Sequence, residues 1–154
     1  MAISFLNRQR KTIFDSYRLK DILDKDYIEN STDLTPDFQK RGGLIPVIVQ
    51  EISTGHILML GYANEEAVTT TIETGLATFY STSRKELWTK GLTSGDTLKL
   101  INLLTDCDQD ALIYQVEMQG SGACHTKNSN HQTRKSCFYR VYSKETDKLK
   151  FIEK

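Results

Sequence analysis

Three cysteines are the residues of this chain best suited to metal or thiol chemistry. Cys124 and Cys137 lie in the polar segment SGACHTKNSNHQTRKSCFYR, residues 121–140, together with two of the three histidines. Cys107 lies in TDCDQDA, residues 105–111, among alternating aspartates. Without a Cys-x2-Cys pair, the spacing does not predict a zinc finger or zinc ribbon. Two interpretations stay open: a catalytic zinc with three protein ligands and one open position, or thiols that only fill the core.

The aspartates around Cys107 offer a second kind of metal chemistry. In an extended strand, Asp106, Asp108 and Asp110 would share one face, with Cys107 and Gln109 on the other. Clustered carboxylates repel one another unless a cation lies among them, and their hard oxygen atoms suit Mg²⁺ or Ca²⁺. A solvated acidic turn between two strands is the simpler alternative.

An EF-hand calcium loop is a third interpretation of the acidic segment. DCDQDALIYQVE places aspartates at the first, third and fifth loop positions and Glu117 at the last. The sixth position is Ala111, where the sharp turn of an EF-hand requires glycine. The residues that follow alternate as in a strand, so we do not expect an EF-hand.

Composition limits the possible partners. The 154 residues suffice for about one domain, and 20 basic against 20 acidic side chains argue against a nucleic-acid-binding protein. No apolar run approaches the ~20 residues of a membrane-spanning helix, so no membrane partner is expected. Three cysteines without a secretory signal predict a reducing, cytoplasmic location. A transit peptide is the weaker alternative, because the first basic side chains precede any acid.

The elements that must position these residues follow from hydrophobic patterning. Residues 1–40 predict an N-terminal extension with a helix over roughly 10–28 that ends before Pro36. From Gly42 onward the pattern is β-rich, and residues 144–154 form a charged, solvated tail. The expected strands cover residues 44–52, 56–62, 76–83, 97–106, 111–119 and 136–143.

One helix is expected between the second and third strands. Asn64 is a suitable N-cap, Glu65 and Glu66 suit the first turn, and Gly75 suits the C-terminal stop. The threonines at 69–71 are weak helix formers, so this helix must depend on tertiary packing.

Five sequence blocks occur in one order and together resemble the phosphoribosyl-AMP cyclohydrolases. They are GLIPVIVQEISTGHILMLGYANEEA, STSRKELWTKGLTSG, DCDQDA, ACHT and SCFYR, from about Gly42 to Arg140. The resemblance implies a hydrolase of histidine biosynthesis that opens the C6–N1 bond of 1-(5-phosphoribosyl)-AMP and gives the formimino aminoimidazole carboxamide ribotide. It also implies an α+β fold: a small, β-rich antiparallel sheet with one or two helices, assembled as an intertwined homodimer.

The same resemblance implies two metal sites. The zinc ligands would be Cys107, Cys124 and Cys137, contributed by both subunits of the homodimer. The magnesium ligands would be Asp106, Asp108 and Asp110. The cyclohydrolase domain would cover residues 41–143. Because the chain ends soon after it, we expect no fused pyrophosphohydrolase activity.

One departure from the family concerns the loop between the last two cysteines. Twelve residues separate Cys124 from Cys137, more than is usual in the family. Doubling a flexible loop costs only about 0.6 kcal/mol of closure entropy, so we expect the site to survive with a longer surface loop. His131 and Arg134 lie in this loop and cannot be aligned securely.

The expected chemistry needs a nucleophile, a proton carrier and phosphate ligands. Zinc lowers the pKa of bound water from about 16 to about 7. His125 is expected to carry protons, unless it only satisfies a backbone carbonyl. Trp88 would stack on the purine or pack in the core. The expected substrate-binding residues are Arg84, Trp88, Lys90, Thr93, Ser94 and Gly95.

Three other functions were weighed against this one. A zinc nucleobase deaminase would show H-x-E and P-C-x-x-C, and the chain has neither. A metal-stabilised interaction module would unfold on metal loss and turn over no nucleotide. A redox sensor would form a disulfide between Cys124 and Cys137 on oxidation.

Overall fold

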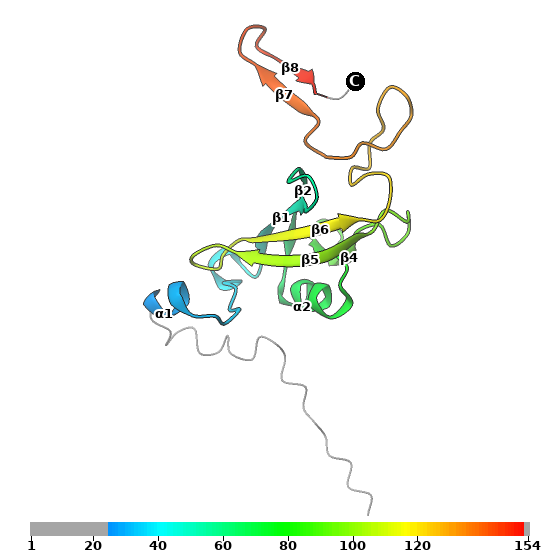
Figure 1. Cartoon of the computed structure of the whole chain (residues 1–154). Helices are drawn as coiled ribbons and strands as arrows, with labels where there is room; N and C mark the ends of the chain where they lie inside the picture. Colours follow the sequence, from blue (N-terminus) through cyan, green and yellow to red (C-terminus); the bar gives the residue numbers. More distant parts are fainter. Residues whose placement is uncertain (1–24, 153–154) are drawn as a thin grey trace, which may run out of the picture.

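The computed structural model describes residues 25–152 of the chain (Figure 1). Two α-helices and one 3-10 helix accompany eight strands within this range. The elements are α1 (Lys25–Asn30), η2 (Gln39–Arg41), β1 (Ile45–Glu51), β2 (Ile57–Ala63), α2 (Glu65–Thr74), β3 (Thr78–Ser81), β4 (Glu86–Thr89), β5 (Leu98–Thr105), β6 (Leu112–Met118), β7 (Arg140–Ser143) and β8 (Lys148–Phe151).

A four-stranded sheet in the order β2-β1-β6-β5 forms the centre of an α+β fold. The hairpins β1–β2 and β5–β6 are antiparallel, as expected. The central strands β1 and β6 run parallel, with Val47 opposite Leu112. The prediction of an antiparallel sheet is therefore wrong for the central pair. Strand patterning encodes which residues are buried but not the direction of the partner strand, and parallel neighbours require the long crossover seen here.

The core lies on one face of this sheet. Four alternate residues of β1 and β6 are fully buried: Val47, Val49, Tyr114 and Val116. Because successive side chains of a strand point to opposite faces, this alternation directs one whole row inward. Each fully buried valine or leucine contributes about 1.5–3 kcal/mol of hydrophobic stabilisation, so these strands hold the scaffold rigid.

Helix α2 begins and ends where its sequence predicts. Asn64 Oδ1 accepts a hydrogen bond from Ala67 N at 2.9 Å, and Gly75 adopts the left-handed φ of 71° that closes the helix. Thr71 is buried, and its Oγ1 accepts from Thr78 N at 3.0 Å. The threonine that weakens the helix locally therefore fastens it to β3.

Two hairpins, β3–β4 and β7–β8, lie outside the main sheet. Strands β4 and β8 escaped the sequence prediction, because each is only four residues long and carries charged residues. The segment expected as a charged tail thus contains β8, which pairs with β7 in a hairpin set apart from the sheet (Figure 1). The helix expected over 10–28 lies mostly outside the described residues. None of the helices described is long and apolar enough to cross a membrane.

Candidate active site and metal ligands

A cavity of about 930 Å³ opens between β2, β4, the loop after β4 and the segment after β6. This volume is in the range of small-molecule sites. The expected site residues that line it are Arg84, Trp88, Lys90, Thr93, Ser94, Cys124, His125 and Cys137. Gly95 is not among the lining residues, and its N–H donates to Gly91 O at 2.8 Å. The geometry therefore gives no support to substrate binding by Gly95.

The loop between Cys124 and Cys137 folds back on itself, so its length does not separate the two thiols. Cys124 N donates to Arg134 O at 3.1 Å, and Arg134 N donates to Thr126 O at 3.0 Å. Cys137 N donates to Leu58 O at 2.8 Å, on the free edge of β2. Both thiols lie on the cavity wall, close enough that each shifts the pKa of the other.

Two further contacts fix the end of this loop. Lys135 Nζ lies 2.5 Å from Glu51 Oε2, and Glu51 is buried on β1. Ser136 Oγ donates to Ile57 O at 2.8 Å. These contacts flank Cys137 on its N-terminal side, so the position of its thiol depends on the central sheet rather than on the exposed part of the loop.

The two thiols differ in acidity. Burial raises the pKa of the Cys124 thiol, but hydrogen bonds from the Thr126 hydroxyl and N–H outweigh burial and hold the pKa below its ordinary value. Desolvation first, and the charge of Cys124 second, raise the pKa of Cys137 to about 11. One thiolate is therefore favoured, and both would ionise only around a cation. Paired thiolates are a donor set that suits a soft or borderline divalent ion such as zinc.

The third thiol lies elsewhere. Cys107 is exposed, in the turn between β5 and β6, and does not line the cavity. The turn precedes β6 and Cys124 follows it, so the two cysteines lie beyond opposite ends of this strand (Figure 1). Seven residues at about 3.3 Å each make β6 roughly 20 Å long. Cys107 therefore cannot join the other two thiols of its own chain.

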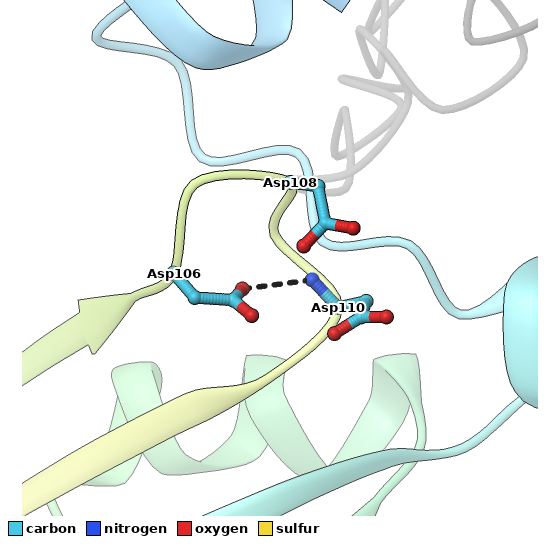
Figure 2. A group of neighbouring side chains, drawn as sticks. All are labelled: Asp106, Asp108 and Asp110. Carbon is cyan, nitrogen blue, oxygen red and sulfur yellow. Dashed lines mark hydrogen bonds between the residues drawn. The ribbon is translucent and has the colours of Figure 1, made fainter.

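The three aspartates converge around the turn between β5 and β6 (Figure 2). One oxygen of each carboxylate lies within 4.8 Å of the others. The segment is a turn and not an extended strand, so the strand geometry considered for it is wrong. Asp106 Oδ1 accepts from Asp110 N at 3.0 Å and from Ala111 N at 3.1 Å, and these bonds curl the chain. The convergence of the carboxylates comes from this curl.

Cations from the N-terminal segment already contact these carboxylates. Lys40 Nζ lies 2.6 Å from Asp108 Oδ2 and 2.5 Å from Asp110 Oδ2, and Arg41 lies 3.3 Å from Asp110. The hydrogen bonds from Lys40 hold the pKa values of Asp108 and Asp110 below their usual range and raise the pKa of Lys40. A divalent ion among these carboxylates would have to displace Lys40.

Gln109 fastens residues 33–37 of the N-terminal segment to the turn between β5 and β6. The residue is 3% exposed and has a φ of 54°. Its Oε1 accepts from Thr35 N at 2.7 Å, its carbonyl accepts from Asp37 N at 2.7 Å, and its Nε2 donates to Asp33 O at 3.0 Å. Sequence reasoning missed both Lys40 and Gln109, because no spacing pattern links residues so far apart in the chain.

Asp96 and Gly91 complete the cavity wall and also escaped the sequence prediction. Asp96 Oδ1 accepts from Ser121 N at 2.9 Å, and this bond lowers the pKa of Asp96. Gly91 has a φ of 77°, and a Cβ there would lie 2.0 Å from the Asp96 carbonyl carbon. The buried Lys90 donates to Asp96 O at 3.4 Å. The only sequence signal for this packing was the pair of glycines within KGLTSGD.

Comparison with known proteins places these motifs in one family. A family model described as phosphoribosyl-AMP cyclohydrolase matches residues 59–139. A protein of that name from Desulfatibacillum aliphaticivorans is 47% identical over 116 residues, which cover 75% of this chain and 86% of the relative. Another from Archaeoglobus fulgidus is 53% identical over 98 residues, or 64% and 84% of the two chains. The histidine biosynthesis bifunctional protein HisIE of Aquifex aeolicus is 53% identical over 98 residues, which cover 64% of this chain and 45% of that longer protein.

Proposed function

The chain belongs to the phosphoribosyl-AMP cyclohydrolase family, and we propose that it opens the adenine ring of 1-(5-phosphoribosyl)-AMP by zinc-dependent hydrolysis of the C6–N1 bond. The enzyme is a hydrolase of histidine biosynthesis. One observation carries the mechanistic proposal: a single cavity wall joins two neighbouring thiols, a histidine and the cationic side chains that a phosphorylated substrate needs.

Zinc is the metal that the cavity's donor set fits. Cys124 and Cys137 would hold it from one subunit, and Cys107 would add the third ligand. When bound, zinc would supply an activated water at neutral pH for attack on C6. In the absence of a metal, the thiol pair would favour one thiolate, because burial first and the negative charge of Cys124 second raise the pKa of Cys137.

The chain's own residues would bind the substrate and move protons. Lys90 is 8% exposed, so its charge faces the cavity with little competition from solvent. The centroid of the Trp88 ring lies 5.7 Å from that of Phe79, with the two rings tilted by 39°, and Trp88 also lines the cavity. The same side chain would therefore pack against the core and stack on the purine. His125 is exposed on the cavity rim, where it would carry a proton toward the departing N1.

A homodimer would resolve the separation of the three thiols. The cavity of one subunit contains Cys124 and Cys137, and its own Cys107 lies beyond the far end of β6. We propose that Cys107 completes the zinc site of the partner subunit, so that each active site draws on two chains. An exposed Cys107 would be accessible to the partner subunit, as this arrangement requires.

Magnesium is proposed for the carboxylates of Asp106, Asp108 and Asp110, whose oxygen atoms already converge. Lys40 lies between two of these carboxylates, so magnesium binding would be an exchange of one cation for another. We therefore expect magnesium affinity to depend on the N-terminal segment.

The proposal is tested by following ring opening of phosphoribosyl-AMP by ultraviolet absorbance, with zinc-loaded and chelator-stripped protein. Turnover that disappears on stripping and returns with zinc would support both reaction and metal. A folded, zinc-loaded protein without turnover would contradict the proposal. Unfolding on zinc removal, without turnover beforehand, would instead favour a metal-stabilised interaction module.

A further inference from the structure

A second cavity adjoins the first and has no assigned role. Its volume is about 390 Å³, and it lies beside the turn that connects β3 to β4. Arg84 and Trp88 line both cavities, so the two adjoin at these side chains. The residues that line the second cavity are Gly61, Tyr62, Phe79, Tyr80, Ser81, Thr82, Ser83, Arg84 and Trp88.

The turn places three hydroxyl side chains and one guanidinium on this cavity. Ser81 Oγ lies 3.4 Å from Ser83 Oγ and accepts from Arg84 N at 3.3 Å and from Arg84 Nε at 3.4 Å. Thr82 lies between these serines and lines the same cavity. Hydrogen bonds therefore hold Ser81, Ser83 and Arg84 together on the cavity wall.

Arg84 keeps donors available for a ligand. Its Nε faces Ser81 Oγ and also lies 3.2 Å from Glu86 Oε1. Among the described residues, the one hydrogen bond that the Arg84 side chain donates comes from Nε, so the two terminal nitrogens donate none. The terminal nitrogens of an arginine form the fork that binds two oxygens of a phosphate.

The chemistry of this turn matches a phosphomonoester. Hydroxyl donors together with an arginine fork are suited to a dianion with three equivalent oxygens. The first cavity has its own cation, Lys90, with Thr93 and Ser94 beside it. The Trp88 side chain lines both cavities and therefore lies where a planar base between two phosphates would be held.

We infer that the turn of Ser81, Thr82, Ser83 and Arg84 holds one of the two phosphate groups of the substrate, while the Lys90 end of the first cavity holds the other. The inference rests on the proposed function for the identity of the substrate. It assigns a binding role to three hydroxyl side chains and explains why two cavities share one aromatic wall. A nucleotide with a single phosphate would use only one of the two ends.

The test uses the full-length, zinc-loaded enzyme and two variants of the turn, Thr82→Val/Ser83→Ala and Arg84→Met. Each should raise KM for phosphoribosyl-AMP by about tenfold or more, with kcat within about twofold of wild type, because binding and not chemistry is lost. The matched control is Lys85→Met, which removes the neighbouring cation from the same turn but not from either cavity. Its KM should stay within about twofold of wild type.

Two outcomes would overturn the inference. Unchanged KM in both turn variants would show that no phosphate binds there, and an equal rise in KM for Lys85→Met would show a general effect of charge. Circular dichroism of each variant separates loss of binding from loss of folding. If wild-type protein opens no ring, the proposed function fails, but calorimetric titration of inorganic phosphate still tests the site. Phosphate should then bind wild type at least about tenfold more tightly than Arg84→Met, and equal affinity would reject the turn as an anion site.

Discussion

The two ends of strand β6 carry the two sets of potential metal ligands, and they are built differently. Beyond Met118, Cys124 and Cys137 lie on the wall of one cavity, with Cys137 N bonded to Leu58 O of β2 and Cys124 N bonded to Arg134 O within the loop. Before Leu112, the aspartates converge in a turn where Asp106 is exposed and Asp110 is buried. The thiols share their cavity with the cations Arg84 and Lys90, whereas the carboxylates are paired directly with Lys40 and Arg41 and line neither cavity.

This difference indicates which set of side chains is neutralised within one chain and which would need a second subunit. Neutralisation by Lys40 and Arg41 stabilises the carboxylate turn within one chain, at the expense of its affinity for metal. The thiol end holds two of the three proposed zinc ligands, and the third, Cys107, does not line the cavity of its own chain. Pairing opposite ends from two subunits would supply Cys107 to the cavity and bring the aspartates toward the substrate.

The largest expected effect separates a shared zinc site from a site within one chain. If the proposed zinc site is correct, Cys107→Ser and Cys124→Ser should each lower turnover by at least about a thousandfold, because each removes a proposed ligand of the metal. A mixed dimer of the two variants, purified by two affinity tags, would contain one intact site of two. It should recover about half of wild-type activity, measured by ultraviolet absorbance.

The control for this experiment uses two cysteines from the same end of β6. A mixed dimer of Cys124→Ser and Cys137→Ser has a defect in both sites and should stay inactive. Zinc content measured by atomic absorption should follow activity in every combination. Absence of recovery in the first mixed dimer would contradict the pairing of opposite ends.

Gly91→Ala should damage the cavity end and leave the carboxylate turn intact. The new Cβ would lie 2.0 Å from the Asp96 carbonyl carbon, at a residue with a φ of 77°, so the loop must shift. We expect a loss of about 2–4 kcal/mol in the free energy of unfolding, measured by urea denaturation. Gly75→Ala tests backbone strain alone, because its Cβ meets nothing within 4 Å, and it should cost less. Equal losses would show that close packing at Gly91 is unimportant.

Asp108→Asn should affect the carboxylate end alone. Removing one carboxylate is expected to weaken magnesium binding about tenfold, measured by calorimetry, while the zinc content stays at the wild-type value. Lys40→Met should act in the opposite direction, because it removes the cation that competes for Asp108 and Asp110. Loss of zinc in Asp108→Asn would show that the two ends do not hold separate metals.

The smallest expected effect concerns the carboxylate at the cavity end. Hydrogen bonds from Ser121 lower the pKa of Asp96 in the folded state. Its stabilisation is therefore present above the unfolded pKa of about 4 and is lost as the pH falls through the lower folded value. Asp96→Asn should destabilise the protein by about 1 kcal/mol at pH 7 and by less at pH 3, measured by urea denaturation. An equal loss at both pH values would mean that the charge of Asp96 contributes nothing.

Sequence patterning was sufficient where the cause is local. Asn64 and Gly75 mark the ends of α2 because capping depends on adjacent residues, and burial alternates along β1 and β6 as periodicity predicts. The parallel pairing of β1 with β6 and the contact of Lys40 with Asp108 join distant segments. No local pattern encodes such contacts, so they required the structure.

At the cavity, the sequence identified side chains but not their supports. The motif residues Arg84, Lys90 and His125 do line one space. Beside them, the backbone of Gly91 packs closely against the backbone of Asp96. The only trace of this contact in the sequence is the glycine itself. The expectation for Gly95 lacks support because its N–H donates to Gly91 O within a turn. The sequence pattern did not predict this hydrogen bond.

The parallel pairing at the centre of the sheet also has a consequence for how the chain folds. Val47 cannot meet Leu112 until the whole crossover between them has been synthesised, so the core forms late during translation. Central contacts between residues so distant in sequence slow folding, because the chain must close a long loop before burial compensates for the lost entropy. The hairpins β1–β2 and β5–β6 can form early, but each exposes a strand edge until β1 finds β6. Newly made chains would therefore be most prone to aggregation just before the residues of β6 become available.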